Sequence, residues 1–231
     1  AFAHKGGLHI SAVEKDPKCY EHIDPLSIGN ERSLVVSNQS GKSNVVNKLK
    51  KFKIEINGKE KKILEFLDLV KKQEFLGYAY DGAEASFELL ARRKFHKFKE
   101  FYSLESFKVS DAKRKDPSGE FHPSSEAKVK IFVGKKSFNS ESAGNGPIHA
   151  LDNALRKALT KYYPKLKGLN LVDYKVRILT PQDGTKALVR VRIESKNDKL
   201  QWSTIGVSHN VIDASYIALN DSITYHLLKS K

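Results

Sequence analysis

Residues 101–231 contain an internal duplication, which limits the folds that this chain can adopt. Stretches in which apolar and polar residues alternate with a period of two, typical of half-buried strands, lead twice to a stretch with helical periodicity. The elements expected are strands at 101–109, 126–133 and 137–142 with a helix at 147–162, then strands at 169–179, 186–194 and 200–206 with a helix at 210–229. A turn of small residues precedes each helix. The repeat of strand-strand-strand-helix predicts two sheets, or one split sheet, related by a pseudo-twofold axis.

The residues before the duplication follow another pattern. Residues 43–100 carry amphipathic helical stripes, whereas residues 1–42 are rich in Asp-Pro and glycine turns. The sequence therefore predicts an α+β protein in three parts: a loop-rich subdomain at 1–42, a helical subdomain at 43–100 and the duplicated domain at 101–231. The residues expected to face the helical core are Val45, Val46, Leu49, Phe52, Ile63, Leu64, Leu67 and Val70.

Two local expectations complete this organisation. Asp81 should cap the third helix, with Glu84 three residues later closing a capping box. The polar stretch 111–125, which contains two prolines and a glycine, should be an exposed loop. The residues of the third helix expected to face its core are Ala83, Phe87, Leu90 and Phe95.

The net charge of +14, from 41 Lys and Arg against 27 Asp and Glu, raises the question of a polyanionic partner. The lysines are scattered on helix faces, mostly beside acidic residues, and the densest basic run, at 92–99, lacks the interleaved glycines of an RNA-binding sheet. A solvated basic surface is the favoured interpretation, and we expect no nucleic-acid partner. A stand-alone nucleic-acid-binding module is the alternative from a different functional class, and strongly salt-dependent binding would support it.

The single cysteine and the hydropathy indicate the compartment. Cys19 cannot form an internal disulfide, which suits a reducing cytoplasm, and an inert side chain is a simpler role for it than a nucleophile. No apolar run approaches the roughly 18–20 residues that span a bilayer, and no signal segment is apparent. We therefore expect a cytoplasmic protein without a membrane partner.

Several longer motifs, in order, resemble one enzyme family. Residues 1–13 (AFAHKGGLHISAV) and 20–25 (YEHIDP) are similar to the segment that follows the catalytic barrel in citramalate synthases, and residues 81–90 (DGAEASFELL) to the helical linker of the same group. Residues 144–147 (GNGP) and 171–178 (LVDYKVRI) resemble the regulatory domain shared with 2-isopropylmalate synthases. The chain is thus identified as resembling the C-terminal half of a citramalate synthase of the 2-isopropylmalate synthase and homocitrate synthase family.

The resemblance implies a transferase that condenses acetyl-CoA with pyruvate in isoleucine biosynthesis. The family's catalytic barrel holds a divalent metal through an acidic residue and a His-x-His pair, and this sequence contains no His-x-His. We therefore expect no metal site and no cofactor in this chain, and no activity from it alone. The alternative is a 2-isopropylmalate synthase that responds to leucine. The opening residues and the 82–88 helix favour citramalate.

In this family the linker reaches into the active site of the partner subunit of a homodimer. By position, the resemblance assigns that role to His9 and Tyr20 as catalytic residues, and an imidazole and a phenol could together orient a water or polarise a thioester. The competing interpretation is structural, with His9 capping a helix and Tyr20 packing at the surface.

The regulatory domain of the family binds its end-product amino acid at the dimer interface, here expected to be isoleucine. The start of the helix near Pro147 would receive the carboxylate, with flanking glycines allowing close approach. Family members often carry Asp or Asn where this chain has His149, which weakens the expected ammonium contact. The effector-binding residues predicted are Gly144, Asn145, Gly146, Pro147, Ile148, His149, Leu171, Tyr174, Ile178 and Leu188. For Leu171, Ile178 and Leu188, plain strand core is an equally open interpretation.

Overall fold

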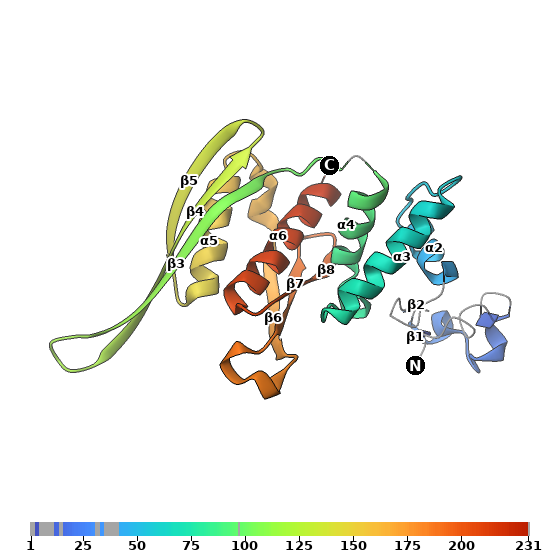
Figure 1. Cartoon of the computed structure of the whole chain (residues 1–231), viewed down its shortest axis with the longest axis horizontal. Coiled ribbons are helices and arrows are strands. Elements are labelled where there is room, and N and C mark those ends of the chain that lie inside the picture. Colours follow the sequence, from blue (N-terminus) through green and yellow to red (C-terminus); the bar gives the residue numbers. More distant parts are fainter. Residues whose placement is uncertain are drawn as a thin grey trace. The chain divides into compact units, whose positions relative to one another are not determined.

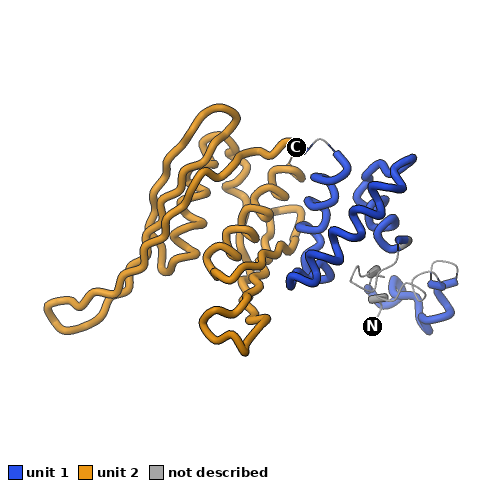
Figure 2. Tube along the Cα trace, viewed as in Figure 1, with its two compact units in different colours: residues 1–98 blue, residues 99–231 orange. Residues whose placement is uncertain are grey.

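The computed structural model of the chain describes residues 3–4, 12–13, 16–30, 33–34, 42–96 and 98–230. The chain divides into two compact units, residues 1–98 and 99–231 (Figure 2). Apolar side chains are buried within both units. Each unit is described on its own below.

The described part of the first unit is mainly helical (Figure 1). Its elements are the parallel pair β1 (Ala3–His4) and β2 (Ser33–Leu34), 3-10 turns at Pro17–Cys19, Pro25–Ile28 and Tyr80–Gly82, and the helices α2 (Lys42–Lys51), α3 (Glu60–Phe75) and α4 (Glu84–Phe95). The Phe66 ring of α3 lies edge-on to Phe87 and Phe95 of α4, with 5.5 Å between ring centroids in both pairs. All three rings are buried, and edge-to-face pairs are favourable. Aromatic packing therefore joins these two helices.

The apolar helix faces agree with the prediction at most positions. Leu64 is an exception because its side chain is 51% exposed, and Leu90 is less buried than its neighbour Leu89. Both lie beside the stripe that faces the core. The predicted core residues that are buried are Val45, Leu49, Ile63, Leu67, Val70, Ala83, Phe87 and Phe95.

The predicted capping box of the third helix is wrong. α4 begins at Glu84, and its N-cap residue, Ala83, provides no side-chain hydrogen bond. Asp81 lies in a 3-10 turn before the helix. The Glu84 carboxylate instead lies 3.0 Å from the ammonium of Lys48 in α2. An ion pair between helices has replaced the local cap.

The second unit contains the predicted duplication. Its elements are β3 (Ser103–Lys115), β4 (Phe121–Val133), β5 (Lys136–Gly144) and α5 (Pro147–Leu159), followed by β6 (Asn170–Ile178), β7 (Val189–Lys196), β8 (Gln201–Ser208) and α6 (Val211–Lys229), with 3-10 turns at Pro164–Gly168 and Pro181–Lys186. Each set of three strands forms an antiparallel sheet in sequence order. Helix α5 packs on β4 and β5, α6 packs on β7 and β8, and the two helices contact each other (Figure 1).

The two repeats share their register as well as their order. The first strand pair of each repeat is interrupted at the same place, between Leu104 and Ser106 in β3 and between Leu171 and Asp173 in β6. Buried helix positions also coincide when they are counted from the first residue of α5 and of α6. These pairs are Ala150 and Ala214, Ala154 and Ala218, Leu155 and Leu219, and Leu159 and Ile223. The predicted fold class is confirmed, and the duplication extends to single residues.

Each repeat brings its helix close to its sheet through a strand glycine. A Cβ atom at Gly144 would lie 2.3 Å from the backbone nitrogen of Ala150, and one at Gly206 would lie 2.0 Å from the carbonyl oxygen of Ala214. Both distances are far below a van der Waals contact. The helices can approach this closely only because these strand positions carry no side chain.

Residues 111–125 belong to a β-hairpin, so the predicted loop is wrong. Strands β3 and β4 remain paired as far as Lys115 and Phe121, and only the few residues between them form the turn. Most side chains of this extension are exposed on both faces. Hydrophobic alternation, which identifies half-buried strands, is absent from a hairpin that buries neither face.

His226 of α6 links three segments of the second unit. Its Nε2 donates to the carbonyl oxygen of Lys165 at 2.9 Å, and its Nδ1 lies 3.3 Å from the side-chain amide of Asn197. The indole of Trp202 stacks on the ring, with 5.8 Å between centroids. Burial lowers the pKa of His226, although the bond to Lys165 acts in the opposite direction. The neutral ring, with its proton on Nε2, fits these contacts.

Acid should therefore weaken the second unit. Because the folded pKa of His226 lies below the ordinary value of 6.5, the unfolded chain takes up the proton first, and the free energy of unfolding should fall as the pH drops below that value. Above it, this contribution should be complete and constant. Urea unfolding between about pH 5 and pH 8 should show this slope, and His226→Gln should reduce it. The exposed His96 gives the control, since His96→Gln should keep the slope; an unchanged slope in His226→Gln would contradict this assignment.

No helix in the described part of the chain combines the length and apolar character that crossing a bilayer requires.

Candidate functional site

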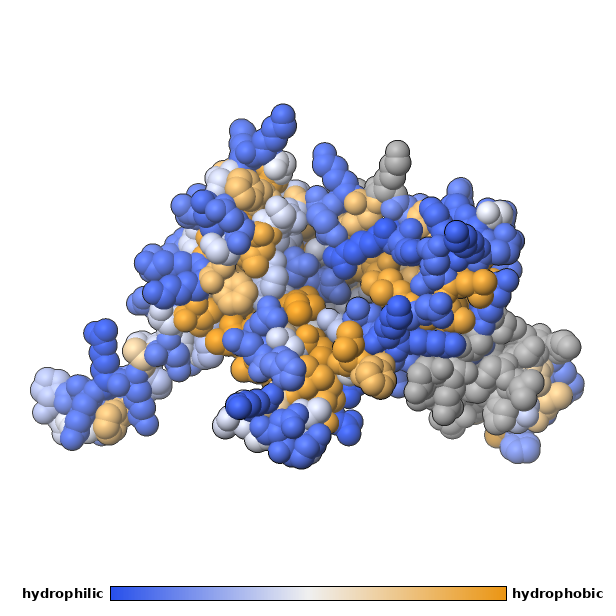
Figure 3. Space-filling model, viewed as in Figure 1, coloured by the Kyte–Doolittle hydropathy of each residue, from blue (hydrophilic) through white to orange (hydrophobic). Residues whose placement is uncertain are grey.

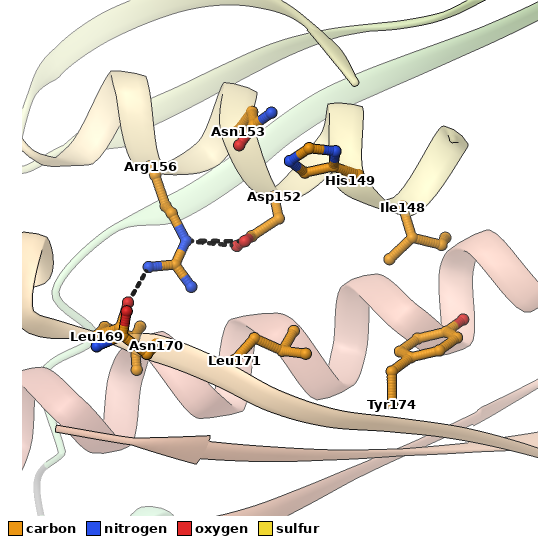
Figure 4. A pocket seen from close by; sticks show the side chains of 9 residues that line it. All are labelled: Ile148, His149, Asp152, Asn153, Arg156, Leu169, Asn170, Leu171 and Tyr174. Carbon is orange, nitrogen blue, oxygen red and sulfur yellow. Dashed lines mark hydrogen bonds and ion pairs between the residues drawn. The ribbon is translucent and has the colours of Figure 1, made fainter. Parts of the chain in front are cut away.

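A cavity of about 560 Å³ lies between α5 and β6, where the helix of the first repeat faces the first strand of the second (Figure 4). We call it the α5/β6 notch. Its volume falls within the range usual for small-molecule sites, roughly 300–1,000 Å³. The residues that line it are Ile148, His149, Asp152, Asn153, Arg156, Leu169, Asn170, Leu171 and Tyr174.

One end of the notch is apolar. Ile148, Leu171 and Tyr174 are half-buried and pack against a core cluster that includes Val191 and Ile193 of β7. The phenolic oxygen of Tyr174 lies 2.8 Å from the hydroxyl of Ser215, which fixes the ring against α6. This end offers a preformed wall for an aliphatic group.

The other end carries two opposite charges on one face of α5. The Nε of Arg156 donates to both carboxylate oxygens of Asp152 at 2.8 Å, and its Nη1 donates to the carbonyl oxygen of Leu169. The two side chains are only 22% and 15% exposed. These bonds use two of the five guanidinium N–H groups. Arg156 can therefore still bind an anion, and the Asp152 carboxylate beside it can accept from a cation.

The structure brings together four of the predicted effector residues and separates the others. Ile148, His149, Leu171 and Tyr174 line the notch. Ile178 lies farther along β6 with its side chain 55% exposed, and it is not among the lining residues. The other predicted residues outside the lining are Gly144, Asn145, Gly146, Pro147 and Leu188.

The predicted turn has a local structural role at the start of α5. Gly144 ends β5. Gly146 is the N-cap residue of α5, so no side chain caps the helix. The backbone N–H of Asn145 donates to Nδ1 of His149 at 3.1 Å. His149 thus stabilises the turn and borders the notch at once.

Five lining residues were missed by the sequence analysis: Asp152, Asn153, Arg156, Leu169 and Asn170. The sequence signal for Asp152 and Arg156 was their spacing, an acidic and a basic residue four positions apart on a helix. That spacing is common on solvated helix surfaces, where it adds only a few tenths of a kcal/mol. Only the approach of β6 distinguishes this pair from an ordinary surface ion pair.

The predicted catalytic residues of the linker are only partly visible. His9 lies outside the described residues. Tyr20 follows the 3-10 turn Pro17–Cys19, where its backbone N–H donates to the carbonyl oxygen of Pro17, and its side chain is 46% exposed. Both roles remain predictions.

Within the described residues, one cluster has the donor atoms of a metal site: Asp116, Glu120 and His122, at the β3–β4 turn. The Asp116 carboxylate accepts from the hydroxyl of Ser118 and the backbone N–H of Glu120, and it lies 2.8 Å from Nε2 of His122. The hydroxyl and imidazole bonds lower the pKa of Asp116 to about 2. These contacts close the hairpin turn and account for the cluster without an ion.

Comparison with known families agrees with this architecture. Residues 1–74 match the homocitrate synthase post-HMGL domain-like family, and residues 81–227 match the LeuA allosteric (dimerisation) domain. The second match covers more than half of the chain and includes both repeats. The chain belongs to the LeuA allosteric (dimerisation) domain family. The α5/β6 notch is therefore a cavity inside a LeuA-type domain, between its two repeats.

Three relatives that align along nearly all of this chain carry the same name. The chain is 51% identical to a protein named (R)-citramalate synthase from Aquifex aeolicus, 47% identical to one from Geobacter sulfurreducens and 43% identical to one from Synechocystis. The alignments cover 100%, 100% and 98% of this chain. They cover only 43%, 43% and 42% of the relatives, so the chain spans less than half of their length.

Proposed function

We propose that this chain is the regulatory part of an (R)-citramalate synthase, and that its LeuA-type domain binds isoleucine in the α5/β6 notch. The observation that carries the proposal is the composition of the notch, with an apolar wall at one end and an Arg156–Asp152 pair at the other. The names of the relatives and the allosteric family of the domain support it.

The notch matches the chemistry of a zwitterionic amino acid. The free N–H groups of Arg156 would hold the carboxylate, since a guanidinium matches a carboxylate in charge and in geometry. The Asp152 carboxylate would accept from the ammonium. A branched aliphatic side chain would then lie against Ile148, Leu171 and Tyr174. An amino acid bound in this way touches both repeats, so its binding favours one arrangement of α5 against β6.

A second copy of the chain is the partner that we propose for the exposed apolar side chains of β6. Val172, Val176 and Ile178 are 42%, 45% and 55% exposed, and they lie on the strand that forms one wall of the notch. Figure 3 shows apolar side chains gathered on the surface of this region. Covering them in a homodimer agrees with the dimerisation domain that the sequence matches.

The remaining roles extend to the whole enzyme. We infer that condensation of acetyl-CoA with pyruvate takes place in a metal-dependent barrel beyond this chain, and that the chain alone is inactive. His9 and Tyr20 would complete the active site in the barrel of the partner subunit. Isoleucine would act by favouring a dimer arrangement that withdraws them. The single cysteine, Cys19, which is exposed, suits a cytoplasmic enzyme.

Calorimetry and sedimentation of the 231-residue chain test the proposal together. Isoleucine should give a saturable heat and raise the melting temperature, and the chain should sediment as a dimer. Leucine and valine should bind more weakly. Tighter binding of leucine would favour the 2-isopropylmalate synthase alternative. A monomer that gives no heat and no stabilisation with any of the three amino acids would contradict the proposed function.

A further inference from the structure

The duplication gives the α5/β6 notch an equivalent position between α6 and β3. Counted from the interruptions in β3 and β6, Leu104 corresponds to Leu171 and Phe107 to Tyr174. Tyr102, just before β3, corresponds to Leu169 by the same count. We call this second position the α6/β3 notch.

The two charged residues of the first notch have no counterpart in the second. Counted from the first residue of each helix, Tyr216 takes the position of Asp152, and Asn220 takes that of Arg156. A tyrosine and a neutral amide therefore replace the ion pair. The α6/β3 notch has neither of the groups that we assign to the amino acid's carboxylate and ammonium.

The Tyr216 side chain fills the α6/β3 notch. Its ring centroid lies 5.4 Å from that of Phe107 on β3, at the place where the first notch is open. Burial raises the pKa of Tyr216 and also that of Tyr102, and after burial the Tyr216 hydroxyl contributes most to the raised pKa of Tyr102. The hydroxyl of Tyr102 is buried without a hydrogen-bond partner among the described residues. The Tyr216 ring thus packs against Phe107 at the position where their counterparts, Asp152 and Tyr174, border an open cavity.

We propose that the α6/β3 notch is a second copy of the amino-acid site, closed by the chain's own Tyr216, and that Tyr216 limits each chain to one bound amino acid. The inference rests on the proposed function of the α5/β6 notch. It goes beyond that function because it names the residue that makes two duplicated positions unequal.

Rebuilding the missing pair tests this inference. In the variant Tyr216→Asp with Asn220→Arg, the two charges stand four residues apart on α6, as Asp152 and Arg156 do on α5. The carbonyl oxygen of Tyr102 would then stand where that of Leu169 stands. Calorimetry with isoleucine should give about one site per wild-type chain and about two per variant chain. Tyr216→Phe keeps the ring and should keep about one.

A second variant, Asp152→Tyr, makes the opposite change and tests the inference even if the double variant does not fold. Asp152→Tyr should close the open notch and abolish isoleucine binding while the melting transition remains cooperative. A folded double variant that still binds one isoleucine, or an Asp152→Tyr chain that binds as the wild type does, would overturn the inference but leave the proposed function standing. A wild-type chain that binds no isoleucine would overturn both.

Discussion

Replacing Gly206 by alanine should lower the free energy of unfolding of the second unit by about 3 kcal/mol. The added Cβ would lie 2.0 Å from the carbonyl oxygen of Ala214 and 2.9 Å from the Cβ of Ile217. The first of these is backbone in α6 and cannot rotate away, so the helix must shift off β8. Such a shift would disturb the buried cluster of Val191 and Ile193, on which the notch wall packs.

Urea unfolding of the 231-residue chain measures this effect. Gly168→Ala is the matched control, because a Cβ there meets no atom within 4 Å and the backbone is not left-handed. Its free energy of unfolding should stay within about 0.5 kcal/mol of the wild type. Equal stabilities for Gly206→Ala and Gly168→Ala would show that α6 is not held against β8 by this close approach.

Replacing Arg156 by leucine should weaken isoleucine binding by at least about 30-fold, which corresponds to roughly 2 kcal/mol. The variant removes the partner that we propose for the ligand carboxylate and leaves the Asp152 carboxylate half-buried without its cation. Asp152→Asn, which keeps size but removes charge, should weaken binding by about tenfold through the ammonium contact.

Lys157→Leu provides the control for a lost positive charge on α5. Its ammonium bonds the carbonyl oxygen of Glu141, and it does not line the notch. Calorimetry should therefore show nearly wild-type affinity for Lys157→Leu. If Arg156→Leu and Lys157→Leu bind isoleucine equally well, the polar end of the notch does not hold the ligand carboxylate.

The duplication could be predicted from the sequence because its signals are local and occur twice. Strands such as β4 bury one face, so Ala127, Val129 and Ile131 alternate with lysines, and the helices follow turns of small residues. The β3–β4 extension could not be predicted in the same way. Its pairing depends on backbone hydrogen bonds and the Asp116 turn, and neither leaves a hydrophobic pattern.

Only part of the candidate site could be predicted, because only some of its residues lie in a local sequence pattern. Ile148, near a helix start, and Tyr174, on a strand, were predicted to bind the effector, and both line the notch. Asp152 and Arg156 were missed because their function depends on β6, which comes later in the chain and is brought to α5 only by tertiary packing. Helix spacing alone cannot distinguish a surface ion pair from one that faces a cavity.

The most direct test of the account is a crystal structure of the 231-residue chain grown with isoleucine. We expect the ligand between α5 and β6, with its carboxylate on Arg156 and its side chain against Ile148, Leu171 and Tyr174. We also expect Tyr216 to remain in the α6/β3 notch. Isoleucine bound at the 144–147 turn instead, or a saturated crystal in which the α5/β6 notch is empty, would contradict the central claim.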